Sequence, residues 1–205
     1  MSIVVEGTIP SRPRYGKLSP REGAGHLMVA DGEGAEAILE LVANAGAGAA
    51  DLLARTQIIY MPGPNGTDMG AQLQSLGADI FFRCNGYATA QPRLKRIFTD
   101  AHMGLQIYLA GTEGLIGQAQ RDAMEAGLPH TAVQTEFRGS TVRRVQCVHC
   151  KGITENVRTD PFRCSHCGLN LFVRDHYSRR YAAFQGVNID AEDPGEVPQA
   201  VEKFK

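Results

Sequence analysis

The sequence predicts an α/β protein with a mostly parallel sheet, followed by a small C-terminal zinc ribbon. Between residues 26 and 140, short apolar runs alternate with amphipathic segments, and glycine-rich turns separate them. Two Cys-x-x-Cys pairs then follow within residues 141–187. Strands that alternate with helices through short connections are typical of a parallel sheet with helices on both faces. Paired cysteines at this spacing are typical of a metal-binding ribbon.

Five apolar runs have the length and composition of buried strands. They are His26–Ala30, Gln57–Tyr60, Asp79–Phe82, Leu105–Ala110 and Thr131–Thr135.

Helices are expected between these runs, because apolar residues recur there at helical spacing. The first carries Ile38, Leu41, Val42 and Ala45 on one face, and Gly46 or Gly48 is expected to end it. The others are a short helix capped by Thr67 or Asp68, a helix that follows Pro92, and a helix that follows Gly111-Thr112.

Changes in composition divide the chain into four regions. Residues 1–25 are rich in proline, arginine and glycine and read as an extended arm that lies over a surface, for example a partner's. Residues 26–140 form the α/β domain, residues 141–187 the ribbon, and residues 188–205 a loose acidic tail.

The net charge and the distribution of apolar residues exclude some classes of protein. The formal net charge is −1, so the whole molecule has no strong field to attract nucleic acid. No stretch approaches the roughly 18 apolar residues of a membrane span, and the start lacks the pattern of a secretory signal. We therefore expect a cytoplasmic protein without a membrane partner.

The ribbon holds the most specific motif of the chain. Cys147-Val148-His149-Cys150 and Cys164-Ser165-His166-Cys167 are separated by thirteen residues. Two residues between thiolates let one tight turn present both sulfurs to one ion, and Gly152 and Gly168 suit such turns. Two turns on neighbouring hairpins would complete a tetrahedral site for Zn²⁺.

A structural role is expected for this ion. About 40 residues bury too little apolar surface to fold alone, and four thiolates leave no open coordination position. A single redox iron, as in rubredoxin, uses the same ligands and stays an alternative. His149 and His166 are expected to be spectators, and the fifth cysteine, Cys84, a buried apolar residue.

Positive charge gathers around the cysteines. Residues 141–181 contain eight Lys or Arg against three Asp or Glu. These cations can neutralise the formal −2 charge of a four-thiolate zinc site, or they can form a binding face. Because the net charge of the chain is near zero, an acidic protein partner is favoured over nucleic acid.

The segment Gly32-x-Gly34 lies between an expected strand and an expected helix, where it could admit a phosphate. Asp31, Glu33 and Glu36 place three carboxylates beside it, and these would repel a pyrophosphate.

The order of segments in residues 26–140 resembles the pyridine-nucleotide domain of the ferredoxin reductase family. Val29–Leu39 looks like its first glycine-rich turn and helix, Ile107–Ile116 like its Cys-Gly-Pro segment, and Val133–Phe137 like its closing strand. The resemblance implies nucleotide contacts at Gly32, Gly34, Gly111 and Thr112. However, Ala110 stands in place of the family's cysteine and Thr112 in place of its proline, and Glu36-Ala37 replaces Thr-Pro.

The C-terminal stretch resembles the small subunit of dimethylamine monooxygenase. The resemblance is carried by Arg144–Cys150, Pro161–Gly168 and Val173–Val187. It implies a complex that uses dioxygen and NAD(P)H to convert dimethylamine to methylamine and formaldehyde. It also implies that haem, flavin and iron–sulfur centres lie on the partners, which are a haem subunit and a flavin and iron–sulfur reductase subunit.

Within such a complex, this chain is expected to be a structural or electron-routing subunit that is not itself catalytic. The ribbon would contact the partners through Arg174, Asp175, Tyr177, Arg179 and Arg180. Two alternatives are an electron-transfer module that binds NAD(P)H and a zinc ribbon that binds nucleic acid.

Overall fold

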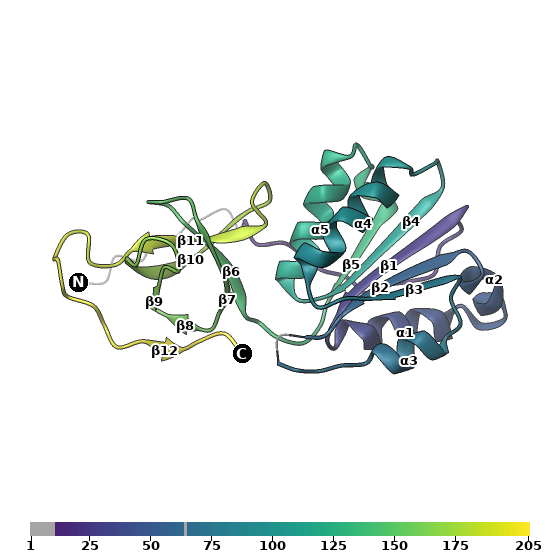
Figure 1. Ribbon diagram of the computed structural model, residues 1–205, viewed down its shortest axis with the longest axis horizontal. Coiled ribbons are helices and arrows are strands. Elements are labelled where there is room, and N and C mark those ends of the chain that lie inside the picture. Colours follow the sequence, from purple (N-terminus) through teal and green to yellow (C-terminus); the bar gives the residue numbers. More distant parts are fainter. Residues whose placement is uncertain (1–10, 64) are drawn as a thin grey trace.

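The chain folds into two packed units joined by a short connection near residue 140 (Figure 1). The computed structural model describes residues 11–63 and 65–205. Pro10, which contributed to the expected arm, and Pro64, in an expected turn, lie outside these residues. No helix within the described ranges is long and apolar enough to cross a membrane.

The first unit is a five-stranded parallel sheet in the order β3-β2-β1-β4-β5. Its strands are β1 (Gly25–Asp31), β2 (Thr56–Met61), β3 (Ile80–Arg83), β4 (Leu105–Gly111) and β5 (Val133–Phe137). Every neighbouring pair is parallel. The predicted fold class is confirmed, and the strand order reverses between β1 and β4, as in doubly wound folds.

Helices cover both faces of this sheet (Figure 1). One face carries α1 (Gly34–Asn44), α2 (Ala49–Leu53) and α3 (Gly70–Ser75), and the other carries α4 (Tyr87–Thr99) and α5 (Glu113–Glu125). Short 3₁₀ turns, η1 (Gly46–Gly48) and η2 (His130–Ala132), complete the unit. The apolar faces of the helices and strands form one core on each side of the sheet, and the buried Cys84 belongs to the second, as predicted.

Three expected boundaries differ from the structure. α4 begins at Tyr87, so Pro92 lies inside it rather than before it. The helix tolerates the missing donor because Ala90, Leu94 and Phe98 bury one face of it in the core. After Gly46, which has a φ of +54°, the chain turns back into a helix, α2, that the sequence analysis missed. η2 replaces the first residues of the last expected strand.

The described part of the arm lies along its own domain. Gly16 N donates to Thr135 O at 3.0 Å, and Leu18 N donates to a carboxylate oxygen of Glu136 at 2.7 Å. Arg12 and the hydroxyl of Tyr15 both reach Glu113 Oε1, at the start of α5, at 3.3 Å. Glu113 is buried, so these contacts compensate a carboxylate that has left water.

The second unit is a five-stranded sheet in the order β7-β6-β11-β10-β9. Its strands are β6 (Arg143–Cys147), β7 (Ile153–Val157), β9 (Phe162–Arg163), β10 (Asn170–Ser178) and β11 (Ala183–Asn188). Among the described strands of this second sheet, only β6 and β11 pair in parallel. The two antiparallel pairs β6–β7 and β9–β10 each enclose one cysteine pair, which agrees with the predicted neighbouring hairpins.

The expected loose tail is wrong for its last residues. β12 (Val201–Glu202) pairs with β8 (Thr159–Asp160), and Phe204 is 4% exposed. The guanidinium of Arg143 lies 4.0 Å from the ring centre of Phe184 and 4.4 Å from that of Phe204. The end of the tail therefore lies on the ribbon, where cation–π contacts with the largely buried Arg143 and burial of Phe204 stabilise it.

Phe204→Ala is expected to destabilise the ribbon by about 3 kcal/mol, because it leaves a cavity and exposes one side of Arg143. Urea denaturation followed by circular dichroism measures the change. Val201→Ala, at a residue that is 63% exposed, is the control and should stay within about 0.5 kcal/mol of wild type. Equal effects of the two changes would contradict this account of the tail.

Candidate metal centre

The two cysteine turns share one backbone geometry. Cys147 N donates to Gly152 O and Cys164 N donates to Leu169 O, both at 2.9 Å. Each cysteine carbonyl then accepts from the amide four residues later, which belongs to Lys151 in the first turn and to Gly168 in the second. The equivalence follows from the shared Cys-x-x-Cys spacing at the end of a hairpin.

Of the two glycines that were predicted to allow the tight turns, only Gly168 does so. Gly168 has a φ of +75°, as expected for a tight turn, but its counterpart in the first turn is Lys151, with a φ of +63°. Gly152 has another role, which is to leave room for His166: a Cβ at Gly152 would lie 2.5 Å from the ring of His166. His166 Nε2 lies 2.9 Å from Ile153 O, so this ring joins the two turns through the backbone.

The four sulfurs converge on one point. All of them lie within 4.8 Å of one another, and two pairs, Cys147–Cys167 and Cys150–Cys164, lie 3.8 Å apart. Four sulfurs bound at about 2.3 Å to a tetrahedral ion lie about 3.8 Å from one another. The residues present therefore fit a tetrahedral metal ion.

The four sulfurs differ in their exposure and in their surroundings. Cys147 and Cys164 are buried, while Cys150 and Cys167 are exposed. Burial raises the pKa of the Cys164 thiol, but hydrogen bonds from the amides of Cys167 and His166 and from the thiols of Cys167 and Cys150 together lower this pKa to about 6. The hydrogen bond from the amide of Leu169 lowers the pKa of the Cys167 thiol, but burial and the neighbouring sulfurs outweigh it, so that this pKa is raised. Leu169, Leu171 and Phe162 pack beside the buried pair and exclude water from that side.

The predicted partner contacts do not all face outward. Arg174, Asp175, Arg179 and Arg180 are exposed, and Asp175 forms an ion pair with Arg143 at 2.7 Å. Tyr177 was predicted at this surface, but it is 6% exposed. Its side chain points inward because it closes the contact between the ribbon and α5: a Cβ at Gly117 would lie 1.9 Å from its hydroxyl.

The predicted nucleotide contacts surround a carboxylate of the protein itself. Thr112 donates to Asp31 from its amide at 2.7 Å and from its hydroxyl at 2.6 Å. A Cβ at Gly111 would lie 1.8 Å from an Asp31 oxygen, and a Cβ at Gly34 would lie 2.3 Å from Ala110 O. Gly111 therefore leaves room for the Asp31 carboxylate, and Gly34 for the backbone of β4. Burial raises the pKa of Asp31 to about 6, against the hydrogen bonds from Thr112 that lower it.

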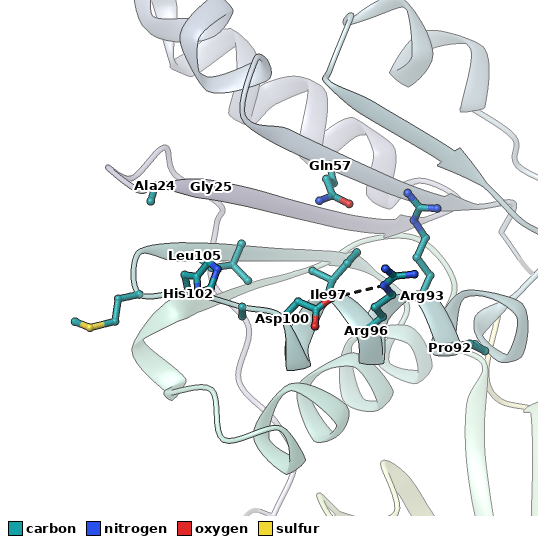
Figure 2. Close-up of a pocket in the computed structure, with 12 residues that line it drawn as sticks. Ala24, Gly25, Gln57, Pro92, Arg93, Arg96, Ile97, Asp100, His102 and Leu105 are labelled. Carbon is teal, nitrogen blue, oxygen red and sulfur yellow. Dashed lines mark ion pairs between the residues drawn. The ribbon is translucent and has the colours of Figure 1, made fainter.

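Two cavities flank the parallel sheet at opposite edges. One of about 790 Å³ lies where the strands end and reaches the ribbon at Arg144; of the predicted nucleotide contacts, only Thr112 lines it. The other, of about 690 Å³, lies near the start of β1 and β4 (Figure 2). There Arg96 and Asp100 pair with each other at 3.6 Å. Ligands of doubly wound sheets bind at the carboxyl edge, so the first cavity is the better placed.

The sequence analysis missed a third hollow, of about 520 Å³, between the arm, α5 and the turn after β10. Its lining includes Arg14, Met124 and His130. No local motif marks these three residues, because they come from the arm, α5 and η2 and meet only in the folded chain.

Cys150→Ser is expected to remove the bound divalent metal, or to weaken its binding at least about tenfold, because it removes one of four thiolates. Elemental analysis of the purified chain measures metal content, and thermal unfolding reports the lost stability. Cys84→Ser, far from the turns, is the control and should retain one ion per chain. Stoichiometric metal in the Cys150 variant would argue against the four-thiolate site.

Asp31→Asn is expected to remove a pH dependence of stability. A carboxyl whose pKa is raised in the folded state stabilises the fold as the pH falls through that pKa. Between pH 8 and pH 5, the wild type should gain about 1.4 kcal/mol of unfolding free energy relative to the variant. Denaturation at both pH values tests this, with the exposed Asp79→Asn as control. A difference that does not change with pH would show that Asp31 is not protonated in this range.

Three comparisons with known proteins bear on the chain. Residues 7–133 match the family model of the dimethylamine monooxygenase subunit DmmA-like N-terminal domain, and residues 144–187 match that of the C-terminal domain. The heme-dependent oxidative N-demethylase delta subunit of Ectopseudomonas mendocina (strain ymp) is 33% identical over 107 residues. That match covers 52% of this chain and 61% of the relative, so the chain spans about three fifths of the relative's length.

Among solved structures, flavohemoglobin from Malassezia yamatoensis, with bound FAD and heme, matches with a TM-score of 0.38 and 13% identity. The match covers 57% of this chain and 32% of the flavohemoglobin. The family models cover both folded units, including the two cysteine turns. The chain therefore belongs to the DmmA-like family of dimethylamine monooxygenase subunits.

Proposed function

We propose that this chain is a cytoplasmic, non-catalytic subunit of an oxidative N-demethylase complex that acts on dimethylamine and consumes dioxygen and NAD(P)H. The observation that carries the proposal is the match to both DmmA-like domains. The related delta subunit belongs to a heme-dependent enzyme, which supports placing the haem on a partner. Flavin and iron–sulfur centres would lie on the reductase partner.

Zinc is the proposed ion of the four-cysteine site. Zn²⁺ has no redox chemistry and stabilises small ribbons through a closed tetrahedral thiolate shell. The sulfur spacing of 3.8 Å supports such a shell. With zinc there, this site would hold the ribbon together and would not carry electrons. A rubredoxin-like iron would instead make the subunit electron-routing, and a visible absorption spectrum separates the two.

Nucleotide binding is proposed to be lost or weak. The amide of Thr112, at the start of α5, is where a phosphate would be expected in a parallel α/β fold. Here Asp31 accepts from that amide, so an internal carboxylate takes the place of an external anion. An electron-transfer module that binds NAD(P)H would need this carboxylate to move or to be protonated. Isothermal titration with NADPH tests this alternative, which near-stoichiometric binding would support.

The ribbon and the turn after β10 are proposed to dock the subunit. Arg174, Arg179 and Arg180 are exposed, and none of them forms an ion pair with another described residue. Unpaired surface guanidinium groups are suited to recognise carboxylates on a partner. A nucleic-acid ligand stays the weaker alternative, because the net charge of the chain is −1.

Co-purification tests the proposed function. The tagged chain, co-expressed with the haem and reductase subunits, is expected to recover both, and dimethylamine turnover is expected to fall when the chain is left out. Arg179→Glu with Arg180→Glu should reduce recovery, because both charges facing the partner are reversed. Lys95→Glu, on an exposed position of α4, is the matched control. Full assembly and turnover without this chain would refute the proposal.

A further inference from the structure

The groove between the arm, α5 and the turn after β10 has the composition of a peptide-binding site. We propose that it binds an acidic segment of a partner subunit, in which an apolar side chain lies between carboxylates. This inference rests on the proposed role in a multi-subunit complex and adds the place and chemistry of the contact. The groove has a volume of about 520 Å³, and its lining includes Arg14, Gly117, Met124, Tyr177 and Arg179.

The first support is an unsatisfied group in the wall of the groove. The hydroxyl of Tyr177 is buried and has no hydrogen-bond partner among the described residues. Buried tyrosine hydroxyls usually find a partner, so this one indicates a missing acceptor. Burial raises the pKa of Tyr177 to about 12, so the hydroxyl keeps its proton and can donate to a carboxylate.

The second support is the charge around the groove. Arg14, Arg179 and Arg180 line it, and all three are exposed. Among the described residues of the lining, the one carboxylate, that of Glu125, already lies 3.9 Å from Arg121. The groove therefore has an excess of positive charge, although the net charge of the whole chain is −1. A local excess of this kind selects acidic segments and steers their approach.

The third support is an apolar side chain exposed in the lining of the groove. Met124 is 43% exposed, so an apolar side chain lies open to solvent between the cations. Methionine adapts its shape to different apolar partners. Single-stranded nucleic acid would need exposed aromatic faces for stacking. The nearby Tyr181 already has the guanidinium of Arg180 at 5.7 Å from its ring centre. The lining thus fits a peptide side chain better than a base.

Photo-crosslinking in the assembled complex locates the partner segment. p-Benzoylphenylalanine replaces Met124 in one preparation and Met103 in a control preparation, and Met103 is 97% exposed at the far edge of the same domain. Irradiation of the co-expressed complex is expected to link position 124, and not position 103, to a partner segment that contains several Asp or Glu. Mass spectrometry identifies the linked peptide.

Two sets of variants then test the chemistry. Arg179→Glu with Arg180→Glu should slow association with the partner about tenfold, and Lys substitutions in the linked acidic segment should restore it. Tyr177→Phe should weaken binding about threefold, because one hydrogen bond is lost. The thermal stability of the free Tyr177→Phe chain should not fall, because its buried hydroxyl has no hydrogen bond there to lose.

The outcomes separate the two proposals. If the complex assembles but position 124 links to no partner segment, or links to RNA, the groove proposal is overturned and the subunit role stands. Charge reversal without any effect on association also overturns it. If no complex forms with the wild-type chain, the proposed function fails, and the groove proposal fails with it.

Discussion

The convergence of four sulfurs is the constraint on which the second half of the molecule depends. The two hairpins β6–β7 and β9–β10 are short, and their shared apolar cluster is small. A metal ion held by Cys147, Cys150, Cys164 and Cys167 would join both hairpins and supply an apparent ~10–16 kcal/mol of folding free energy. The matching backbone hydrogen bonds give the two turns the same shape, so that each turn presents two sulfurs to one ion. The strands that follow, and the residues they carry to the surface, depend on that junction.

A second contact fixes the position of the ribbon relative to the parallel-sheet unit. Tyr177 packs against Gly117 of α5, and Arg12 and Tyr15 of the arm reach Glu113 at the start of the same helix. Arm, helix and ribbon therefore meet at one place. The exposed arginines of the turn after β10 stand beside Arg14 and Met124 because of this packing. The proposed docking site belongs to both units and would be lost if either one moved.

The parallel sheet has the strand order of a doubly wound fold, and a carboxylate of the chain itself lies where a ligand would be expected. The strand order reverses between β1 and β4, where such domains hold their ligand. At that position Asp31 accepts two hydrogen bonds from Thr112, and the glycines around it pack against the carboxylate and the backbone. A buried carboxylate with a raised pKa is a cost to the fold at neutral pH. Its presence supports a domain that serves as a scaffold.

The sequence by itself determined the fold class and pointed to the four cysteines that converge, because both depend on local spacing. Apolar runs at strand length and Cys-x-x-Cys pairs act over a few residues, and Thr112 was identified beside α5, which it caps. Only the tertiary structure decided where Pro92 lies in α4, that Lys151 rather than Gly152 takes the left-handed conformation, and that Tyr177 points inward. It also brought Arg14, Met124 and Arg179 to one groove. The contacts of Tyr177 and of the groove join residues more than fifty positions apart, and no local pattern records them, because packing between distant elements creates them.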